Sequence, residues 1–107
     1  MKVRGDEVIE YKSQAQEKNK FLAGIVSLVN TEGGDLILGV KEEDGIPVDF
    51  CGLEITNADE EINRLEKIIR NGVEPKITGH EFHAINLSNG QPILILRLPS
   101  SWAKPHV

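Results

Sequence analysis

The sequence predicts a single α+β domain in which two helices pack on one mixed β-sheet. Apolar residues recur at helical spacing in two segments, and shorter apolar runs rich in Val, Ile and Leu lie between and after them. Glycine, asparagine and aspartate clusters separate these segments. With 107 residues, the chain has room for one hydrophobic core. We therefore expect the order strand, helix, strand, strand, helix, strand, strand over residues 1–107.

The first half of the chain predicts two strands around a helix. Residues 7–12 mix β-branched and aromatic residues with polar ones, as short strands do. A capping-box pattern at residues 13–16 and an apolar stripe then predict a helix from Gln14 to Asn30. Gly24 lowers helix propensity, and we expect it to mark a close crossing over the sheet. The nearly continuous apolar run at residues 36–40 predicts a central buried strand.

A glycine-rich turn connects the first helix to the central strand. It consists of Asn30, Thr31, Gly33 and Gly34. The two glycines supply the positive-φ positions that a helix C-terminus needs. Because they follow a helix rather than open one, a structural turn is favoured over a phosphate-binding loop.

The second half predicts a hairpin, a helix and a second hairpin. Asp44-Gly45 is a hairpin signal, and residues 46–51 are the expected antiparallel partner of the central strand. Cap and acidic residues at 56–60 announce a helix that ends at Asn71-Gly72. Strands are expected near residues 77–87 and 92–98, joined through Asn89-Gly90.

Charge and cysteine content restrict the class of function. The net charge is −5, whereas domains that bind nucleic acid with their whole surface are basic. A local basic patch remains compatible with that balance. No apolar run approaches the length of a membrane span, and the single cysteine, Cys51, predicts a reducing, cytoplasmic compartment.

Basic residues gather in small groups. Lys12, Lys18 and Lys20 surround the start of the first helix and are the better candidates for contacts with a nucleic-acid backbone. Arg97 and Lys104 form a C-terminal group. Basic residues on the second helix have glutamates nearby, so we interpret them as a solvated, ion-paired face.

Carboxylates near two strands predict an alternative, catalytic function. If the strand carrying Glu7 and Glu10 neighbours the central strand, Glu10 and Glu42 could meet at one end of the sheet. Clustered carboxylates hold Mg²⁺ or Mn²⁺ and can organise phosphodiester hydrolysis. A solvated strand face and an acidic hairpin tip are the other interpretation. His80 and His83 lie three apart on a predicted strand, so we interpret them as surface residues and not zinc ligands.

Several motifs together resemble one family. Glu10-Tyr11-Lys12 resembles the Glu-Phe-Lys signature of Schlafen-type AlbA domains, also called divergent AAA domains. The stretch Asn30-Thr31-x-Gly33-Gly34, followed by Gly39-Val40, is similar to the Asn-Thr-x-Gly-Gly hallmark of that family. Residues 98–106 resemble its C-terminal portion. The resemblance spans about residues 6–106.

The resemblance implies an α+β fold and a DNA- or RNA-binding function, in bacteria as the N-terminal domain of transcriptional regulators. Related animal domains carry an acidic endoribonuclease centre of two glutamates and an aspartate. Glu10 matches the second glutamate, but the first falls on Gly5, with Glu7 close by. After Gly-Val the family has Asp-Asp, whereas this chain has Lys41 and Glu42.

Three hypotheses follow from these observations. The first is a non-catalytic nucleic-acid-binding regulatory module cut from a longer bacterial protein, weakly binding in isolation and needing no cofactor. The second is a nuclease that holds Mg²⁺ or Mn²⁺ with Glu10 and Glu42, with Glu7 in support. The third is an assembly domain, for example a homodimer formed through exposed strand edges.

Overall fold

The computed structural model describes residues 2–4, 7–14, 17–30, 33–73, 76–77 and 79–99. Two helices and seven strands lie in this part of the chain. In chain order they are β1 (Lys2–Arg4), β2 (Glu7–Lys12), α1 (Lys18–Val29), β3 (Gly34–Leu38), β4 (Lys41–Glu43), β5 (Ile46–Asp49), α2 (Ala58–Gly72), β6 (Glu81–Asn86) and β7 (Pro92–Leu98).

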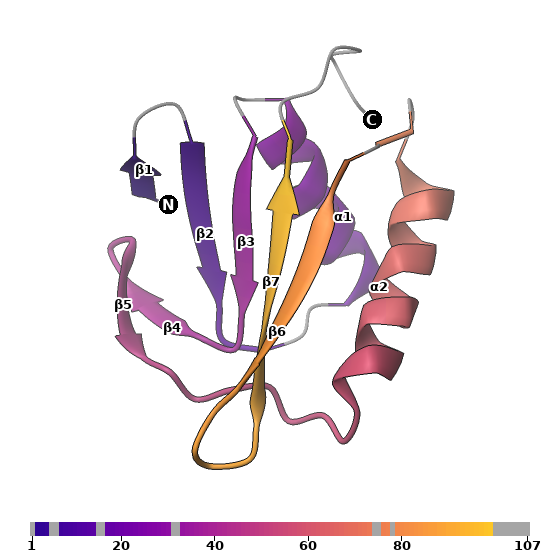
Figure 1. Ribbon diagram of the computed structural model, residues 1–107. Coiled ribbons are helices and arrows are strands. Elements are labelled where there is room, and N and C mark those ends of the chain that lie inside the picture. Colours follow the sequence, from indigo (N-terminus) through magenta and orange to yellow (C-terminus); the bar gives the residue numbers. More distant parts are fainter. Residues whose placement is uncertain are drawn as a thin grey trace.

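Five of the strands form one mixed sheet in the order β1-β2-β3-β7-β6 (Figure 1). Strands β2 and β3 run parallel, and every other neighbouring pair in this sheet is antiparallel. Since α1 connects β2 to β3, the parallel pair is a β-α-β unit. The predicted α+β class, with two helices and a mixed sheet, is confirmed. Strand β1 is an addition that the sequence patterns did not predict.

The β4–β5 hairpin is a separate two-stranded sheet, so the expected pairing of residues 46–51 with the central strand is wrong. The chain leaves the main sheet at Gly39, whose φ is 103°. A Cβ at this position would lie 3.2 Å from the backbone of Gly52, which also donates a hydrogen bond to the Gly39 carbonyl. This close approach fixes the exit of the chain from β3 and directs the hairpin away from the sheet.

Both helices cover the same face of the sheet (Figure 1). Alternate residues of a strand point to opposite faces, and here the leucines of β3 and β7 point to the helices. They form the core with residues of α1 and α2 such as Phe21 and Leu65, which are fully buried. The isoleucines between those leucines, Ile37 and Ile95, point to the opposite face and are only partly buried.

Helix α1 begins later than expected. Its N-cap is Glu17, whose Oε1 accepts a hydrogen bond from the Lys20 backbone N–H at 3.3 Å. The expected start at Gln14, with Ser13 as the cap, is therefore wrong, because Ser13 and Gln14 lie in a bend. The helix ends as predicted at Asn30, its C-cap.

The turn after α1 has the expected backbone geometry where it is described. Gly33 and Gly34 both have positive φ, 85° and 155°. Gly34 then opens β3 and pairs with Leu98 of β7. Thr31 lies outside the described residues.

The two helices contact each other through a glycine other than the predicted one. An added Cβ at Gly24 would meet no atom within 4 Å, so the expected close crossing at this residue is wrong. A Cβ at Gly72 would instead lie 2.6 Å from the Leu22 side chain. The early part of α1 therefore packs against the end of α2.

The remaining elements follow the sequence closely. Helix α2 has Asn57 as its N-cap and ends at Gly72, as predicted. Strand β7 has the predicted bounds. Strand β6 is shorter than the predicted strand at residues 77–87 and begins at Glu81. Gly90 in the β6–β7 turn has a φ of 86°. Neither described helix has the length and apolarity that a membrane-spanning segment requires.

Candidate nucleic-acid interface

The start of α1 carries exposed positive charge. Lys18 and Lys20 lie in its first turn and are both exposed. This turn contains no acidic residue, and Glu17 precedes it as the cap. The N-terminal end of a helix bears a partial positive charge from its free N–H groups. Lysines and helix dipole therefore attract an anion at the same place.

Lys12 lies at the end of β2, where the chain turns towards α1. Its carbonyl accepts hydrogen bonds from the Gly39 and Val40 N–H groups, at 2.7 and 3.2 Å. Its ammonium lies 3.3 Å from a carboxylate oxygen of Glu10, two residues earlier on the same face of the strand. The Lys12 side chain is 40 % exposed and still presents its charge to solvent. The Glu10-Tyr11-Lys12 motif is thus hydrogen-bonded to the Gly39-Val40 motif through the backbone of Lys12.

The structure separates Arg97 from these lysines. Arg97 is paired with Asp35 across β7 and β3, whereas Lys12 is paired with Leu38, about 10 Å further along β3. The Arg97 guanidinium donates to both Asp35 carboxylate oxygens, at 3.1 and 3.4 Å, on the face of the sheet that carries no described helix. Lys104, the other predicted member of its group, lies outside the described residues.

Two further exposed cations, Arg70 and Lys76, lie at the end of α2 and just after it. The sequence patterns assign Arg70 to the solvated face of the second helix and do not single out Lys76. Leu22 is one helical turn after Lys18 and packs on Gly72, two residues after Arg70. Lys76 follows shortly and donates from its ammonium to the Arg70 carbonyl, which caps the end of α2. The crossing thus brings the end of α2 beside the early part of α1, while Arg70, two residues before Gly72, lies on another side of α2. Only the long-range Leu22–Gly72 contact reveals this, and no local pattern encodes it.

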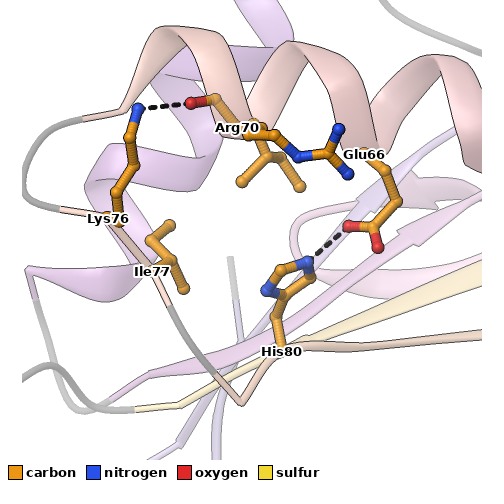
Figure 2. Close-up of a pocket in the computed structure, with 6 residues that line it drawn as sticks. Glu66, Arg70, Lys76, Ile77 and His80 are labelled. Atoms are coloured by element: carbon orange, nitrogen blue, oxygen red, sulfur yellow. Dashed lines mark hydrogen bonds and ion pairs between the residues drawn. The ribbon is translucent and has the colours of Figure 1, made fainter.

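A hollow of about 250 Å³ opens beside this end of α2. We call it the α2 pocket, and Figure 2 shows the side chains that line it. Its lining residues are Glu66, Ile69, Arg70, Lys76, Ile77 and His80. The two isoleucines give it an apolar wall, and the charged side chains come from α2 and from the segment before β6.

His80 departs from the expected surface position, whereas His83 is 58 % exposed, as expected. The His80 side chain is only 17 % exposed, and its Nε2 contacts a carboxylate oxygen of Glu66. Its ring meets that of Phe82 edge to face, with centroids 6.1 Å apart. The second ring nitrogen, Nδ1, is buried and has no hydrogen-bond partner among the described atoms.

The middle of α2 has the ion-paired surface that the sequence predicts. Arg64 donates from Nε and one terminal nitrogen to the Glu61 carboxylate, at 2.8 and 2.7 Å. This hydrogen bonding raises the pKa of Arg64, and the charge of Glu61 adds to the effect. Arg64 therefore stays charged throughout the physiological range, and Glu61 is its structural partner.

The acidic residues proposed for a metal site have other partners in the structure. The Glu10 carboxylate contacts Lys12, and the Glu42 carboxylate accepts the Gly45 N–H at the tip of its own hairpin. The side chain of Glu7 is not among those described. In the described part of the chain, no three His, Cys, Asp or Glu side chains are grouped to hold a metal ion. The nuclease hypothesis stays a prediction.

Comparisons with known proteins identify the family. In structure, the chain is similar to the N-terminal domain of a protein from Nitrosomonas europaea, named as related to the ATP-dependent DNA helicase RecG. The TM-score is 0.64 at 21 % identity, over 92 % of this chain and 67 % of the other, which shows a shared fold. No curated protein sequence matches. The family model described as Schlafen, AlbA_2 matches residues 5–107, so the chain belongs to this family.

Proposed function

We propose that this chain is a nucleic-acid-binding regulatory module that contacts the phosphate backbone with the joined ends of α1 and α2. The observation that carries the proposal is the pair of exposed lysines, Lys18 and Lys20, in the first turn of α1. The exposed cations at the end of α2, Arg70 and Lys76, add to it. We define the α1/α2 cationic surface as Lys18, Lys20, Arg70 and Lys76. Lys12 lies outside this definition because Glu10 partly neutralises it.

The overall charge of the chain fits a local surface of this kind. With a net charge of −5, most of the molecule repels phosphate. The acidic β4–β5 hairpin carries Glu42, Glu43, Asp44 and Asp49 against a single lysine. Nucleic acid would therefore be held in one orientation, with this hairpin turned away from it.

Family membership and the structural neighbour support the same class of function. The chain belongs to the Schlafen AlbA_2 family, for which a DNA- or RNA-binding function is the expectation, and the structural neighbour is the N-terminal domain of a protein named as related to a DNA helicase. An N-terminal module of this type would deliver a larger protein to its nucleic acid. Weak binding by the isolated module suits that arrangement, since another region would add its own contacts.

The experiment is fluorescence anisotropy with labelled duplex DNA, single-stranded DNA and tRNA, in EDTA to suppress metal-dependent cleavage. Because binding releases counterions from the phosphates, the association constant falls as salt rises. A plot of its logarithm against the logarithm of the salt concentration has a slope of about −0.9 per neutralised phosphate on duplex and about −0.7 on single strands. Four cations therefore predict slopes of up to about −3.6 and −2.8. Flat titrations with all three polymers at low salt would overturn the proposal.

A further inference from the structure

The apolar side chains of the β4–β5 hairpin are exposed. Among the described residues, four large apolar side chains are exposed, and three of them are Ile46, Val48 and Phe50, at 58 %, 51 % and 58 %. The fourth, Ile85, lies on β6 instead. Single exposed apolar residues are ordinary on protein surfaces, whereas a group of them marks a site of interaction. We call Ile46, Val48 and Phe50 the β5 apolar patch.

Packing within the domain does not explain this patch. Its residues lie outside the hydrophobic core, to which the leucines of β3 and β7 belong. Among the described strands, β5 pairs only with β4, and β4 contacts β2. Figure 1 shows the hairpin beside β2 and away from α2. Apolar side chains that stay in water gain nothing from the hydrophobic effect, so the patch indicates a surface for a partner.

Exposed carboxylates accompany the patch. Glu43 is the register partner of Ile46, so the two residues are neighbours across the hairpin. Asp49 lies within the patch segment and Asp44 at the turn of the hairpin, and all three acidic residues are exposed. A partner that covers the apolar side chains therefore faces these negative charges, and cations at its rim would complement them. Nucleic acid and anionic membranes would be repelled, which leaves a protein segment as the fitting partner.

A second copy of this chain fits the patch less well. A symmetric contact of patch on patch would place the carboxylates of one hairpin against those of the other, and like charges repel each other. Pro47 lies within β5 and has no backbone N–H to donate to an added strand. Proline and charged residues on an edge strand oppose pairing with another copy. Charge and backbone therefore both favour a cationic partner that is recognised by its side chains.

We propose that the β5 apolar patch binds an extended, cationic segment of a partner protein, in which apolar residues alternate with lysine or arginine. The patch residues occupy every second position of the chain, and such positions in a strand lie about 6.6 Å apart. Alternate side chains of an extended partner segment have the same spacing. This inference goes beyond the proposed function, because the hairpin lies outside the α1/α2 cationic surface. The module would join a protein to the nucleic acid that it binds.

The test is an NMR titration of the full chain at low salt, with isotope-labelled isoleucine and valine methyl groups. The probe is a synthetic heptapeptide with blocked ends that alternates lysine with valine. One control peptide alternates glutamate with valine, and the other alternates lysine with serine. We expect the lysine–valine peptide to shift the methyl signals of Ile46 and Val48, with a Kd of about 1 mM or below. Each control keeps only half of the contacts and should bind at least about tenfold more weakly.

Variants of the patch test its apolar part. Val48→Ser and Phe50→Ser should each weaken binding of the lysine–valine peptide about fivefold or more, because each removes an apolar contact. The matched control is Ile85→Ser, which removes a similarly exposed apolar side chain from β6 and should leave binding unchanged. All three side chains are exposed, so the variants should stay folded, and the unchanged methyl signals of the core check this.

A second pair of variants tests the charge. Glu43→Gln with Asp49→Asn should also weaken binding of the lysine–valine peptide about fivefold or more. Asp59→Asn with Glu60→Gln removes the same charge from the start of α2 and should have a much smaller effect. Equal weakening by the two double variants would show that only total charge matters and would overturn the inference.

The remaining outcomes decide between occupants of the patch. Equal binding of the lysine–serine and lysine–valine peptides would overturn the inference, and so would the absence of shifts at Ile46 and Val48 with about 1 mM lysine–valine peptide. Dimerisation of the free chain in sedimentation, lost in Val48→Ser, would make a second copy the occupant and overturn it too.

The proposed function is tested separately on the same variants. Val48→Ser should bind labelled single-stranded DNA and tRNA as wild type does, since the patch lies outside the α1/α2 cationic surface. Weaker binding by Val48→Ser would place nucleic acid on the patch and overturn this inference. Flat anisotropy titrations of the wild type together with peptide binding at the patch would overturn the proposed function alone.

Discussion

The two helices of this domain begin with opposite charges. The first turn of α2 carries Asp59, Glu60 and Glu61 behind its Asn57 cap, whereas the first turn of α1 carries lysines and no acidic residue. Acidic residues near a helix N-terminus stabilise the helix by about 0.3–1 kcal/mol each, and cations there oppose the dipole. The charges in the first turn of α2 therefore stabilise the fold, whereas Lys18 and Lys20 in the first turn of α1 oppose the dipole.

This difference indicates which helix end has a function beyond folding. Stability explains every charge at the start of α2. It does not explain Lys18 and Lys20, which lie at the positive pole of α1 and are exposed. A bound phosphate would remove the conflict, since it would interact favourably with the lysines and with the dipole. The comparison therefore separates stability from binding, and substitutions at the two ends should affect different properties.

The largest expected effect follows from neutralising the start of α1. Lys18→Gln with Lys20→Gln should weaken binding to single-stranded DNA and tRNA about tenfold at low salt. The salt slope should also become shallower by about 1.4, for two lost phosphate contacts on single strands. The free energy of unfolding should not fall, because both removed cations oppose the dipole. Anisotropy and urea denaturation measure the two properties on the same sample.

The matched control removes the same amount of positive charge from the middle of α2. Arg64→Gln with Lys67→Gln changes two exposed cations that lie outside the α1/α2 cationic surface. Binding should be much less affected than by the α1 double variant. Equal weakening by both double variants would show that only the total charge matters, and would contradict the comparison.

Much of the fold could be predicted because its signals are local. The Asn57 cap, the acidic first turn and Gly72 together bound α2, and Asn89-Gly90 fixes the turn before β7. The start of α1 was mispredicted because Ser13 offers a better local cap than Glu17, and tertiary structure placed the bend there instead. The pairing of β5 was mispredicted because the Gly39–Gly52 contact, thirteen residues apart, redirects the chain.

The candidate site was less predictable than the fold. Lys18 and Lys20 were found because cations at a helix start are a local pattern. Arg70 was assigned to the solvated face of α2 and Lys76 was not singled out, since the approach of the end of α2 to α1 depends on the long-range contact between Leu22 and Gly72. His80 was taken for a surface residue because the pattern of β6 says nothing of Glu66, which contacts it from another element.

The next largest effect is expected from removing the N-cap of α2, Asn57. The Asn57 Oδ1 accepts the Glu60 N–H at 3.1 Å, in the standard capping geometry. Asn57→Ala should lower the free energy of unfolding by about 1 kcal/mol. Glu17→Ala at the α1 cap should cost less, since its bond is 3.3 Å long and exposed. Urea denaturation measures both, and a larger loss at Glu17 would contradict the assignment of stability to α2.

A smaller effect comes from the two helical glycines. Gly24→Ala should raise the free energy of unfolding by about 0.5–1 kcal/mol, because alanine favours the helix and nothing lies within 4 Å of the added Cβ. Gly72→Ala gains no such benefit, since its Cβ would press on Leu22. Thermal and urea denaturation of the two variants compare the same substitution with and without the helix contact. If both variants were stabilised equally, the close packing of Leu22 on Gly72 would be refuted.

The smallest effect belongs to the ion pair on the surface of α2. Arg64→Ala should reduce the free energy of unfolding by less than about 0.5 kcal/mol, because an exposed pair three residues apart is screened by water and salt. Glu61 raises the pKa of Arg64, so the stabilisation linked to the arginine is complete below the pKa that Arg64 has in the unfolded state and falls as the pH rises through its folded pKa, in the strongly alkaline range. The difference between wild type and variant should therefore be constant from pH 6 to 9 and shrink in high salt. Denaturation series in pH and in salt measure both trends. If the difference in the free energy of unfolding grew across this pH range, another titrating group would be coupled to the pair. The charges in the middle of α2 would then not be a simple control for those at the start of α1.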